Sequence, residues 1–276
     1  MRERLVVSVI VSTYNWPQTL DLVLSALDEQ HYAEFEILVA DDGSTDDTAA
    51  LIRVHPAGRC RAIQHVWQPD NGFRKAEVVN KAILKAVGDY IIFLDGDCIP
   101  RPNWLAQHAK LAQPRRFVTG NRLLLTAPFT EHVMANRIAV GRYSFMDWWR
   151  RRDLGTYEVL SKLLYLPDGP WRHLRKRLTK YLFGSNFAAW RRDLVAVNGL
   201  DARYQGWGKE DNDLAARLIH AGVLRKDGRY ATSVIHLWHE LADRDDLGRN
   251  MQLLKAVVKS RAIRAVRGLD QHECPF

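Results

Sequence analysis

An alternation of strand-like and helix-like segments in the first hundred residues restricts the fold of this chain more than any other feature. Short apolar runs typical of buried strands alternate with segments in which apolar residues recur at helical spacing. In the segment 17–30, for example, Leu20, Leu24 and Leu27 stand at i, i+4 and i+7. The strand-like runs span residues 5–11, 35–40, 62–67 and 90–94. A β-α-β-α order of this kind predicts an α/β fold with a doubly wound, mainly parallel sheet and helices on both faces.

The turn after the first strand argues against one large class of such folds. Residues 12–15 read Ser-Thr-Tyr-Asn, where a dinucleotide-binding domain would carry Gly-x-Gly-x-x-Gly. The chain has 276 residues, 47% of them hydrophobic, which is enough for the core of one large domain or two small ones. Since it contains no internal repeat and no low-complexity linker, we predict a single unit.

The cysteines and the apolar runs indicate where such a protein resides. The three cysteines lack the spacing of a metal site, and an odd number of them fits a reducing cytosol without a disulfide framework. No stretch approaches the roughly 18 consecutive apolar residues of a membrane span. The apolar run near the N-terminus lacks the small-residue cleavage site of a signal peptide. We therefore expect a soluble, intracellular protein.

Two carboxylates emerge where the fourth strand-like run ends. The run 90–94 is followed directly by Asp95-Gly96-Asp97. In an open parallel sheet, ligands bind outside the carboxyl ends of the strands. Two carboxylates at such a position suit a hard divalent cation that is shared with a diphosphate. A plain turn is the alternative, because Asp and Gly are ordinary turn residues.

A second acidic cluster, formed by Glu210, Asp211 and Asp213, opens another segment with helical spacing. Acidic residues at a helix start interact favourably with the helix dipole, which is one explanation for the cluster. Three carboxylates exceed what capping needs, and their repulsion and partial burial would raise the pKa of one of them and make it a better general base. The preceding residues 206–208, Gly-Trp-Gly, suggest a mobile loop that closes over a substrate.

Two histidines follow near the end of a later strand-like segment. His236 and His239 stand three residues apart in the run Ile-His-Leu-Trp-His. A pair of this kind is often structural, but imidazole nitrogens also bind transition metals such as manganese. With Asp95 and Asp97 upstream, the sequence favours a metal-binding role for at least one of them.

A basic aromatic insertion, residues 142–182, carries much of the positive charge of the chain. The net charge is +8, and residues 142–180 contain ten Lys/Arg against four Asp/Glu, interleaved with Trp, Tyr and Phe. This mixture fits an anionic membrane surface and, less well, a nucleic-acid track. An ordinary insertion that packs its aromatic residues inward is the alternative.

Taken in order, these motifs resemble those of an inverting glycosyltransferase of family 2 with the GT-A fold. The matching elements are Val-Ile-Val-Ser-Thr-Tyr-Asn at 9–15, Asp-Asp-Gly-Ser at 41–44, Asn-Gly-Phe-Arg-Lys-Ala at 71–76 with Asn80, Asp-Gly-Asp at 95–97 and Trp-Gly-Lys-Glu-Asp at 207–211. The resemblance covers roughly residues 5–240. The last element and the later histidines resemble the galactosyltransferase-like C-terminal region of bacterial polysaccharide polymerases and animal β-galactosyltransferases.

The resemblance implies roles for individual positions. The donor-binding residues would be Ser12, Tyr14, Asp41, Asp42, Asn71, Arg74, Lys75 and Asp95. The acceptor-binding residues would be Trp207, Gly208, Glu210 and, in the strand-like segment 183–190, Asn186. Asp211 matches the catalytic base. Asp97 and His239 match the ligands of Mn²⁺ (or Mg²⁺), with His236 the weaker candidate.

The implied function is transfer of a sugar from a UDP-sugar, with inversion, to a glycan or lipid-linked acceptor in bacterial cell-surface polysaccharide or lipopolysaccharide synthesis. Residues 1–98 would form the nucleotide-sugar-binding half, 99–240 the acceptor-binding and catalytic half, and 241–276 a helical tail. A single unit without membrane spans favours one linkage over a processive polymer. The basic aromatic insertion would hold the protein peripherally on the cytoplasmic face of the inner membrane, and we expect no nucleic-acid partner.

Two other functions remain open from the sequence. A sugar-nucleotide pyrophosphorylase would also need metal-binding carboxylates, but it should carry a Gly-rich Arg/Lys loop after the first strand. A non-catalytic membrane-surface binding protein would explain the insertion, but it would leave both acidic clusters without a role.

Overall fold

The central sheet confirms the predicted α/β architecture. The computed structural model describes residues 5–57, 63–151, 155–156, 158–177, 179, 182, 184–240 and 243–272. Within these residues, seven strands form one sheet in the order β3-β2-β1-β4-β8-β6-β9. The strands are β1 (Val7–Thr13), β2 (Phe35–Asp41), β3 (Ile63–Trp67), β4 (Tyr90–Asp95), β6 (Arg116–Thr119), β8 (Asn186–Trp190) and β9 (Leu224–Asp227). Only β8 runs antiparallel to its neighbours among these described strands, so the sheet is mainly parallel.

The register of the parallel strands brings several motifs to one edge of the sheet. Ser12 of β1 pairs with Asp95 of β4, and Thr13 pairs with Asp41 of β2. Because neighbouring parallel strands end at the same edge, the polar residues that follow them lie close together. This edge carries the site described below.

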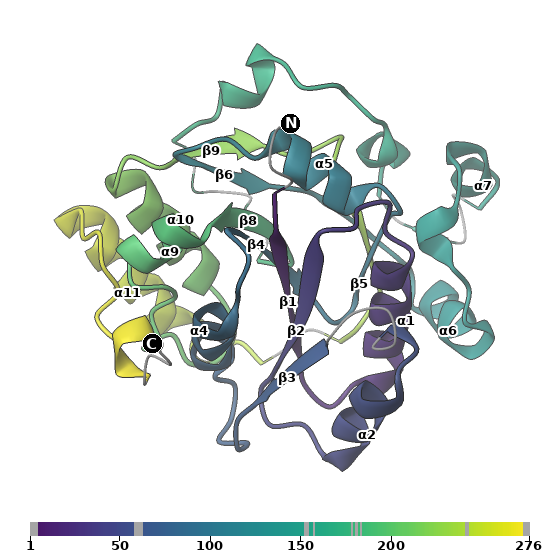
Figure 1. Ribbon diagram of the computed structural model, residues 1–276, viewed down its shortest axis with the longest axis horizontal. Helices are drawn as coiled ribbons and strands as arrows, with labels where there is room; N and C mark the ends of the chain where they lie inside the picture. The colour runs from purple at the N-terminus through teal and green to yellow at the C-terminus, as the bar shows by residue number, and fades with distance from the viewer. Residues whose placement is uncertain are drawn as a thin grey trace.

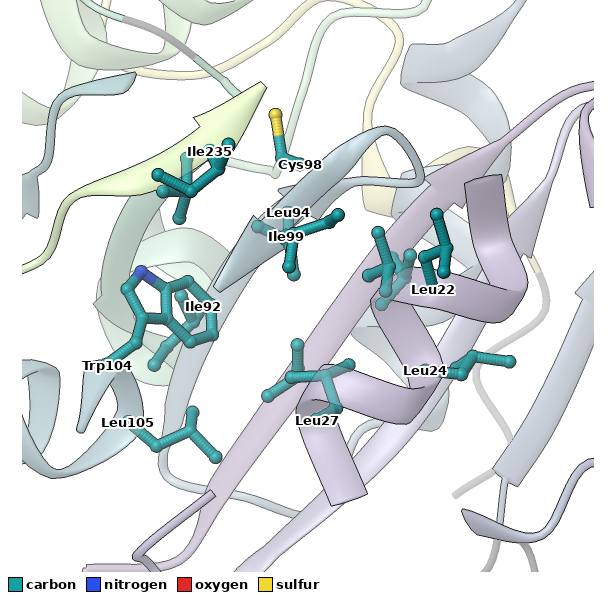
Figure 2. Close-up of a cluster of buried hydrophobic side chains, with 14 of the residues drawn as sticks. Leu22, Leu24, Leu27, Ile92, Leu94, Cys98, Ile99, Trp104, Leu105 and Ile235 are labelled. Carbon is teal, nitrogen blue, oxygen red and sulfur yellow. The ribbon is translucent and has the colours of Figure 1, made fainter. Parts of the chain in front are cut away.

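Alternate residues along the strands point to two separate hydrophobic layers. In β4, Tyr90, Ile92 and Leu94 belong to one buried cluster, whereas Ile91 and Phe93 belong to the other. The first cluster includes residues of α1 (Pro17–Asp28), α2 (Asp46–Val54), α5 (Trp104–Leu111) and α6 (Ala127–Asn136). The second includes residues of α4 (Lys75–Lys85), α9 (Arg191–Ala196) and α10 (Glu210–His220). Helices therefore cover both faces of the sheet, as predicted (Figure 1). Figure 2 shows part of the first cluster, in which leucines of α1 gather with Ile92 and Trp104.

A small second sheet lies beside the strand-end motif of residues 95–97. Among the described residues it has three strands in the order β5-β10-β7, namely β5 (Cys98–Pro100), β10 (Val234–His236) and β7 (Arg122–Leu124). His236 pairs with Cys98 in antiparallel register. This pairing brings His236, late in the chain, next to Asp97.

The basic aromatic insertion contains short helices, and the structure corrects part of its expected surface. Its elements are η1 (Val140–Arg142), α7 (Phe145–Arg150), η2 (Leu160–Leu163) and η3 (Pro170–His173), and α7 lies at the edge of the molecule beyond α6 (Figure 1). Trp148 is fully buried in the first hydrophobic cluster, whereas Trp149 remains 50% exposed. Arg172 is also buried, because its guanidinium donates to the carbonyls of Asp227 and Arg229 at the end of β9. Arg152, Tyr157 and Lys180 lie outside the described residues.

The C-terminal segment packs on the outside of the second layer. It consists of α11 (Leu247–Ser260), which contacts α10, and η4 (Leu269–Gln271), which contacts α4 (Figure 1). None of the helices in the described part of the chain has both the length and the apolar character that a membrane crossing requires.

Candidate active site

A cavity of about 440 Å³ opens at the carboxyl edge of the sheet. It gathers most of the residues that the sequence singled out as functional. Those that line it are Ser12, Tyr14, Asp42, Lys75, Asp95, Asp97, Trp207, Gly208, Glu210, Asp211 and His239.

Asp42 and Tyr14 form one end of this cavity. Asp42 is almost fully buried, and its carboxylate accepts hydrogen bonds from Gln68 Nε2 at 2.6 Å and from the Arg74 amide at 2.7 Å. Burial raises the pKa of Asp42, and these two hydrogen bonds offset only part of that effect. The ring of Tyr14 is 52% exposed, and its hydroxyl donates to Asp70 at 2.9 Å. This end therefore offers a buried carboxylate and an exposed aromatic residue.

Three predicted donor-binding residues, Asp41, Asn71 and Arg74, do not line the cavity. Asp41 is fully buried and accepts from the Ser44 amide at 2.8 Å, with His65 Nε2 at 2.8 Å from its other oxygen, so it holds the turn in place. The guanidinium of Arg74 is directed to Glu77 at 3.3 Å and to the Pro69 carbonyl at 3.1 Å.

Arg74 therefore reaches the cavity indirectly, through the hydrogen bond from its backbone amide to Asp42. Asn71 is exposed in the loop before Arg74.

Lys75 lies among three carboxylates in the middle of the site. Its ammonium donates to Asp95 Oδ1 at 2.6 Å, and Ser12 Oγ donates to the same oxygen at 3.1 Å. Burial acts to lower the pKa of Lys75, but the charges of Asp95, Asp211 and Glu210 outweigh burial and raise it above its ordinary value. Lys75 is therefore a permanent cation at this position.

Asp97 faces two histidines. Its Oδ2 lies 3.3 Å from His236 Nε2 and 3.4 Å from His239 Nε2, and the two imidazole rings stand nearly perpendicular at 86°. Burial acts to raise the pKa of Asp97, but the hydrogen bond from His236 and the charges of both histidines lower it to about 2. The buried Oδ1 has no hydrogen-bond partner among the described residues, and the Cys98 thiol lies close by.

This geometry changes the ranking of the two histidines. The sequence favoured His239 over His236 as a ligand, yet both are equally close to Asp97. His236 is the more buried of the two, because the pairing of β10 with β5 fixes it beside Asp97.

Glu210 and Asp211 begin α10 at the other acidic cluster. Burial and the neighbouring Asp211 raise the pKa of Glu210 to about 8. Burial also raises the pKa of Asp211, although the Lys75 charge and a hydrogen bond from the Gly184 amide at 2.9 Å act in the opposite direction. The third acid, Asp213, is fully buried in an ion pair with Arg217 at 2.7 Å. Two of the three carboxylates therefore belong to the cavity, and the third is structural.

Trp207 stands in the loop before α10 and is 40% exposed. The guanidinium of Arg244 lies over its ring at 5.0 Å from the centroid. On one side, the Gly206 amide donates to the Phe73 carbonyl at 3.2 Å. On the other, Asn250 Nδ2 donates to the Gln205 carbonyl at 3.0 Å. The loop is therefore held between the segment before α4 and the start of α11.

Asn186 has a different role from the expected acceptor binding. Its side chain is fully buried and does not line the cavity. Its amide nitrogen donates to the carbonyls of Asn121 and Thr232, and its oxygen accepts from Trp104 Nε1 at 3.2 Å. Asn186 therefore joins β8 to its surroundings instead of contacting a ligand.

Several cavity residues were not predicted from the sequence. The ring of Trp16 meets that of His239 edge-on at a centroid distance of 6.2 Å, and Arg122 and Phe73 also line the cavity. Trp16 follows the first strand closely, so its place in the chain was a usable signal. No sequence pattern singled out Arg122, because it lies in β7 and its position depends on how the small sheet pairs.

Comparison with known proteins agrees with this geometry. Residues 8–182 match the family described as glycosyl transferase family 2. The chain belongs to glycosyl transferase family 2. Residues 173–239 also match the family described as the N-terminal domain of galactosyltransferase. The predicted family is thus confirmed.

Relatives of this family 2 chain are longer proteins. It is 29% identical over 240 residues to the hyaluronan synthase of Pasteurella multocida, covering 79% of this chain and 23% of that protein. It is 31% identical over 229 residues to the validoxylamine A glucosyltransferase of Streptomyces hygroscopicus subsp. jinggangensis (strain 5008), covering 78% of this chain and 52% of that one. The chain therefore spans 23% of the length of the first relative and 52% of the length of the second.

Solved structures confirm the GT-A fold. A mannosyltransferase from Pyrobaculum calidifontis, in complex with GDP-Man and Mn²⁺, superposes with a TM-score of 0.59 at 20% identity, covering 85% of this chain and 57% of that one. S. aureus TarS 1–349 in complex with UDP gives a TM-score of 0.62 at 14% identity, covering 96% of this chain and 68% of that one. These similarities support neither the pyrophosphorylase nor the non-catalytic alternative.

Proposed function

We propose that this family 2 chain is a metal-dependent, inverting glycosyltransferase that moves a sugar from a UDP-sugar to a glycan or lipid-linked acceptor. One observation carries the proposal: a single cavity unites the buried carboxylate of Asp42, a carboxylate beside two histidines, and a pair of carboxylates with raised pKa. The names of its relatives, which are synthases and glucosyltransferases of sugar-containing products, support it.

The donor would lie along the carboxyl edge of the sheet. Asp42 can accept the uracil N–H, because each carboxylate oxygen accepts one hydrogen bond from the described residues and has a second lone pair for another. Tyr14 can cover the base with its exposed ring. Ser12 and Asp95 would contact the ribose or the donor sugar, and Lys75 holds Asp95 in place for that contact. Asp41, Arg74 and Asn71 would act indirectly, by shaping the loops around Asp42.

The residues around Asp97 fit a divalent cation. The unpartnered buried oxygen of Asp97 and the adjacent imidazole nitrogens of His236 and His239 form a mixed oxygen and nitrogen donor set. Such a set suits Mn²⁺ better than Mg²⁺, which prefers oxygen ligands. A cation bound there would neutralise charge on the departing diphosphate.

Asp211 would act as the general base. It takes the proton of an acceptor hydroxyl while that oxygen bonds to the anomeric carbon and the bond to UDP breaks on the opposite side, which inverts the configuration. Because its pKa is raised, Glu210 would hold a proton near neutral pH with which it could hydrogen-bond the acceptor, and Trp207 with Gly208 would present a flat surface to a sugar ring. The Lys75 charge favours the ionised form of Asp211 that a base requires.

The experiment that tests this function measures UDP release from a panel of UDP-sugars with saccharide acceptors, with and without Mn²⁺. Release that depends on acceptor and Mn²⁺ would support the proposal, and the anomeric configuration of the product would report inversion. Formation of UDP-sugar from UTP and a sugar 1-phosphate would instead identify a pyrophosphorylase, and a protein that only binds vesicles would release nothing.

We further propose that the acceptor is reached at the cytoplasmic face of an anionic membrane, in the synthesis of a cell-surface polysaccharide or lipopolysaccharide. Exposed apolar side chains of α7, namely Phe145, Met146 and Trp149, stand beside the exposed Arg150. Arg175, Lys176 and Arg177 add exposed positive charge later in the basic aromatic insertion. Basic residues with exposed aromatic rings are typical of peripheral contact with anionic lipids.

A further inference from the structure

Gly184 lies where the chain leaves the basic aromatic insertion and enters β8, and it contacts the proposed base directly. Its amide donates to Asp211 Oδ2 at 2.9 Å. Gly184 also lines the cavity, together with its neighbour Ser185. The carboxylate of Asp211 is therefore held by a backbone group from a distant part of the chain.

There is no room for a side chain at position 184. A Cβ atom built on Gly184 would lie 2.2 Å from Asp211 Oδ2, 2.3 Å from Oδ1 and 2.4 Å from Cγ. These distances are far below van der Waals contact, so a Cβ would displace the carboxylate. The φ angle of Gly184 lies outside the left-handed region, so the backbone itself does not require glycine here. The three atoms that a Cβ would approach most closely all belong to Asp211.

A second contact joins the same two segments. Asn212 Nδ2 donates to the Thr179 carbonyl at 2.6 Å, one residue after Asp211 in α10. Two successive residues at the start of α10 thus bond to the chain that ends the insertion. Two hydrogen bonds therefore connect the start of α10 with the chain around the end of the insertion.

We propose that Gly184 is a positioning residue, which holds the Asp211 carboxylate flat against its backbone and leaves one oxygen directed to the acceptor hydroxyl. This inference rests on the proposed role of Asp211 as the base.

The kinetic test uses Gly184→Ala, assayed by UDP release. A displacement of the base by about 1 Å is expected to lower kcat by about 100-fold. The KM for the UDP-sugar and the affinity for UDP with Mn²⁺ should stay within threefold of the wild type, because Asp42 and Asp97 are untouched. Gly248→Ala is the matched control, since a Cβ at Gly248 meets no atom within 4 Å. Unchanged kcat in Gly184→Ala would overturn the inference.

A double-mutant comparison separates positioning from general misfolding. Gly184→Ala should lower Tm in the wild-type background, but it should cause little loss in the Asp211→Ala background, where the clashing carboxylate is gone. An equal loss of Tm in both backgrounds would overturn the inference. The Tm comparison can be made even if none of the variants transfers sugar. If Asp211→Ala kept full transfer while the Tm coupling persisted, the assignment of the base would fail and the steric contact would stand.

Discussion

Lys75 stands between the proposed donor side and the proposed acceptor side of the cavity. It donates to Asp95, and its charge acts on Asp211 and Glu210. Three carboxylates in so small a volume would repel one another, and the charge of Lys75 offsets part of that repulsion. Burial raises the pKa of both Glu210 and Asp211, whereas the Lys75 charge acts to lower both.

The first prediction concerns Asp211. Asp211→Asn keeps the shape of the side chain but removes its ability to accept a proton, so transfer should fall by about 10²–10⁴-fold. UDP affinity in the presence of Mn²⁺, measured by calorimetry, should be nearly unchanged. A parallel loss of UDP affinity would instead assign Asp211 to the donor site. Asp243→Asn, on an exposed loop, is the control.

The second prediction concerns the stability cost of Glu210. Its pKa rises from an ordinary 4.5 to about 8 on folding, so between these values the folded chain holds a proton that the unfolded chain lacks. The stability that this proton provides is fully present below about pH 4.5 and is lost as the pH rises to about 8, with a slope of at most ~1.4 kcal/mol per pH unit.

Glu210→Gln removes this dependence. The variant should gain free energy of unfolding relative to the wild type as the pH rises from about 5 to about 8, measured by urea titration. Glu131→Gln, on the exposed surface of α6, is the matched control. A difference between Glu210→Gln and wild type that stays constant with pH would contradict the buried proton.

The third prediction concerns the histidines. Excess chelator should abolish transfer, and Mn²⁺ should restore it. His236→Ala and His239→Ala should each weaken Mn²⁺ binding by at least ~10-fold, because each removes a donor next to Asp97. Titration of Mn²⁺ by electron paramagnetic resonance measures this directly, with His132→Ala on the exposed surface of α6 as control. Transfer that persists in chelator would contradict the metal site.

At the scale of elements, the segment around the start of α11 supports the Trp207 loop, which the sequence did not indicate. The sequence suggested a separate helical tail from residue 241, yet Asn250 and Arg244 hold the Trp207 loop from outside. Asn250 is fully buried, and its contact with the Gln205 carbonyl ties α11 to that loop.

The fourth prediction follows from this contact. Asn250→Leu leaves the Gln205 carbonyl without its donor, which should cost about 1–3 kcal/mol of stability. Amide hydrogen exchange in residues 205–209 should accelerate, and transfer should fall while UDP affinity stays the same. Lys255→Leu, at an exposed position of the same helix, should change neither. Unchanged exchange in Asn250→Leu would show that the loop does not depend on α11.

The strand ends could be predicted from the sequence, whereas contacts across the insertion could not. Ser12 and Asp95 follow from periodicity, since neighbouring parallel strands must end at one edge. The contact of Gly184 with Asp211 depends on where a long insertion returns to the sheet, which no local pattern specifies.

Trp148 and Trp149 are adjacent and chemically identical, so only the packing of α7 decides which is buried. Asn186 has a polar side chain of the kind that often binds ligands. Only the register of β8 shows that this side chain lies in the interior.

At the scale of the whole molecule, positive charge is concentrated in one part of the chain, since residues 142–180 contain ten Lys/Arg against four Asp/Glu. The fifth prediction is that wild type floats with anionic vesicles at low salt and is released by added salt. Replacing Arg150, Arg175, Lys176 and Arg177 with Gln should release it, since each charge near an anionic surface contributes about 1 kcal/mol. Arg151 is left intact because it stacks on Tyr143 at 4.9 Å.

The matched control replaces the same number of exposed cations in the C-terminal segment. These are Lys255, Lys259, Arg261 and Arg267. Release by both sets would indicate attraction by net charge alone. Wild type that does not bind anionic vesicles at low salt would rule out the membrane contact.

Because β5 pairs with β10, the proposed metal site beside Asp97 can form only after most of the chain has been synthesised. Asp97 comes early in the chain and His236 late, and a ribosome must release the second long after the first before the two can meet. A ligand that binds only the folded state stabilises it by mass action. Mn²⁺ should therefore protect the finished protein against proteolysis and leave nascent chains that end before β10 unprotected, so that supply of the ion during biosynthesis influences how much enzyme survives.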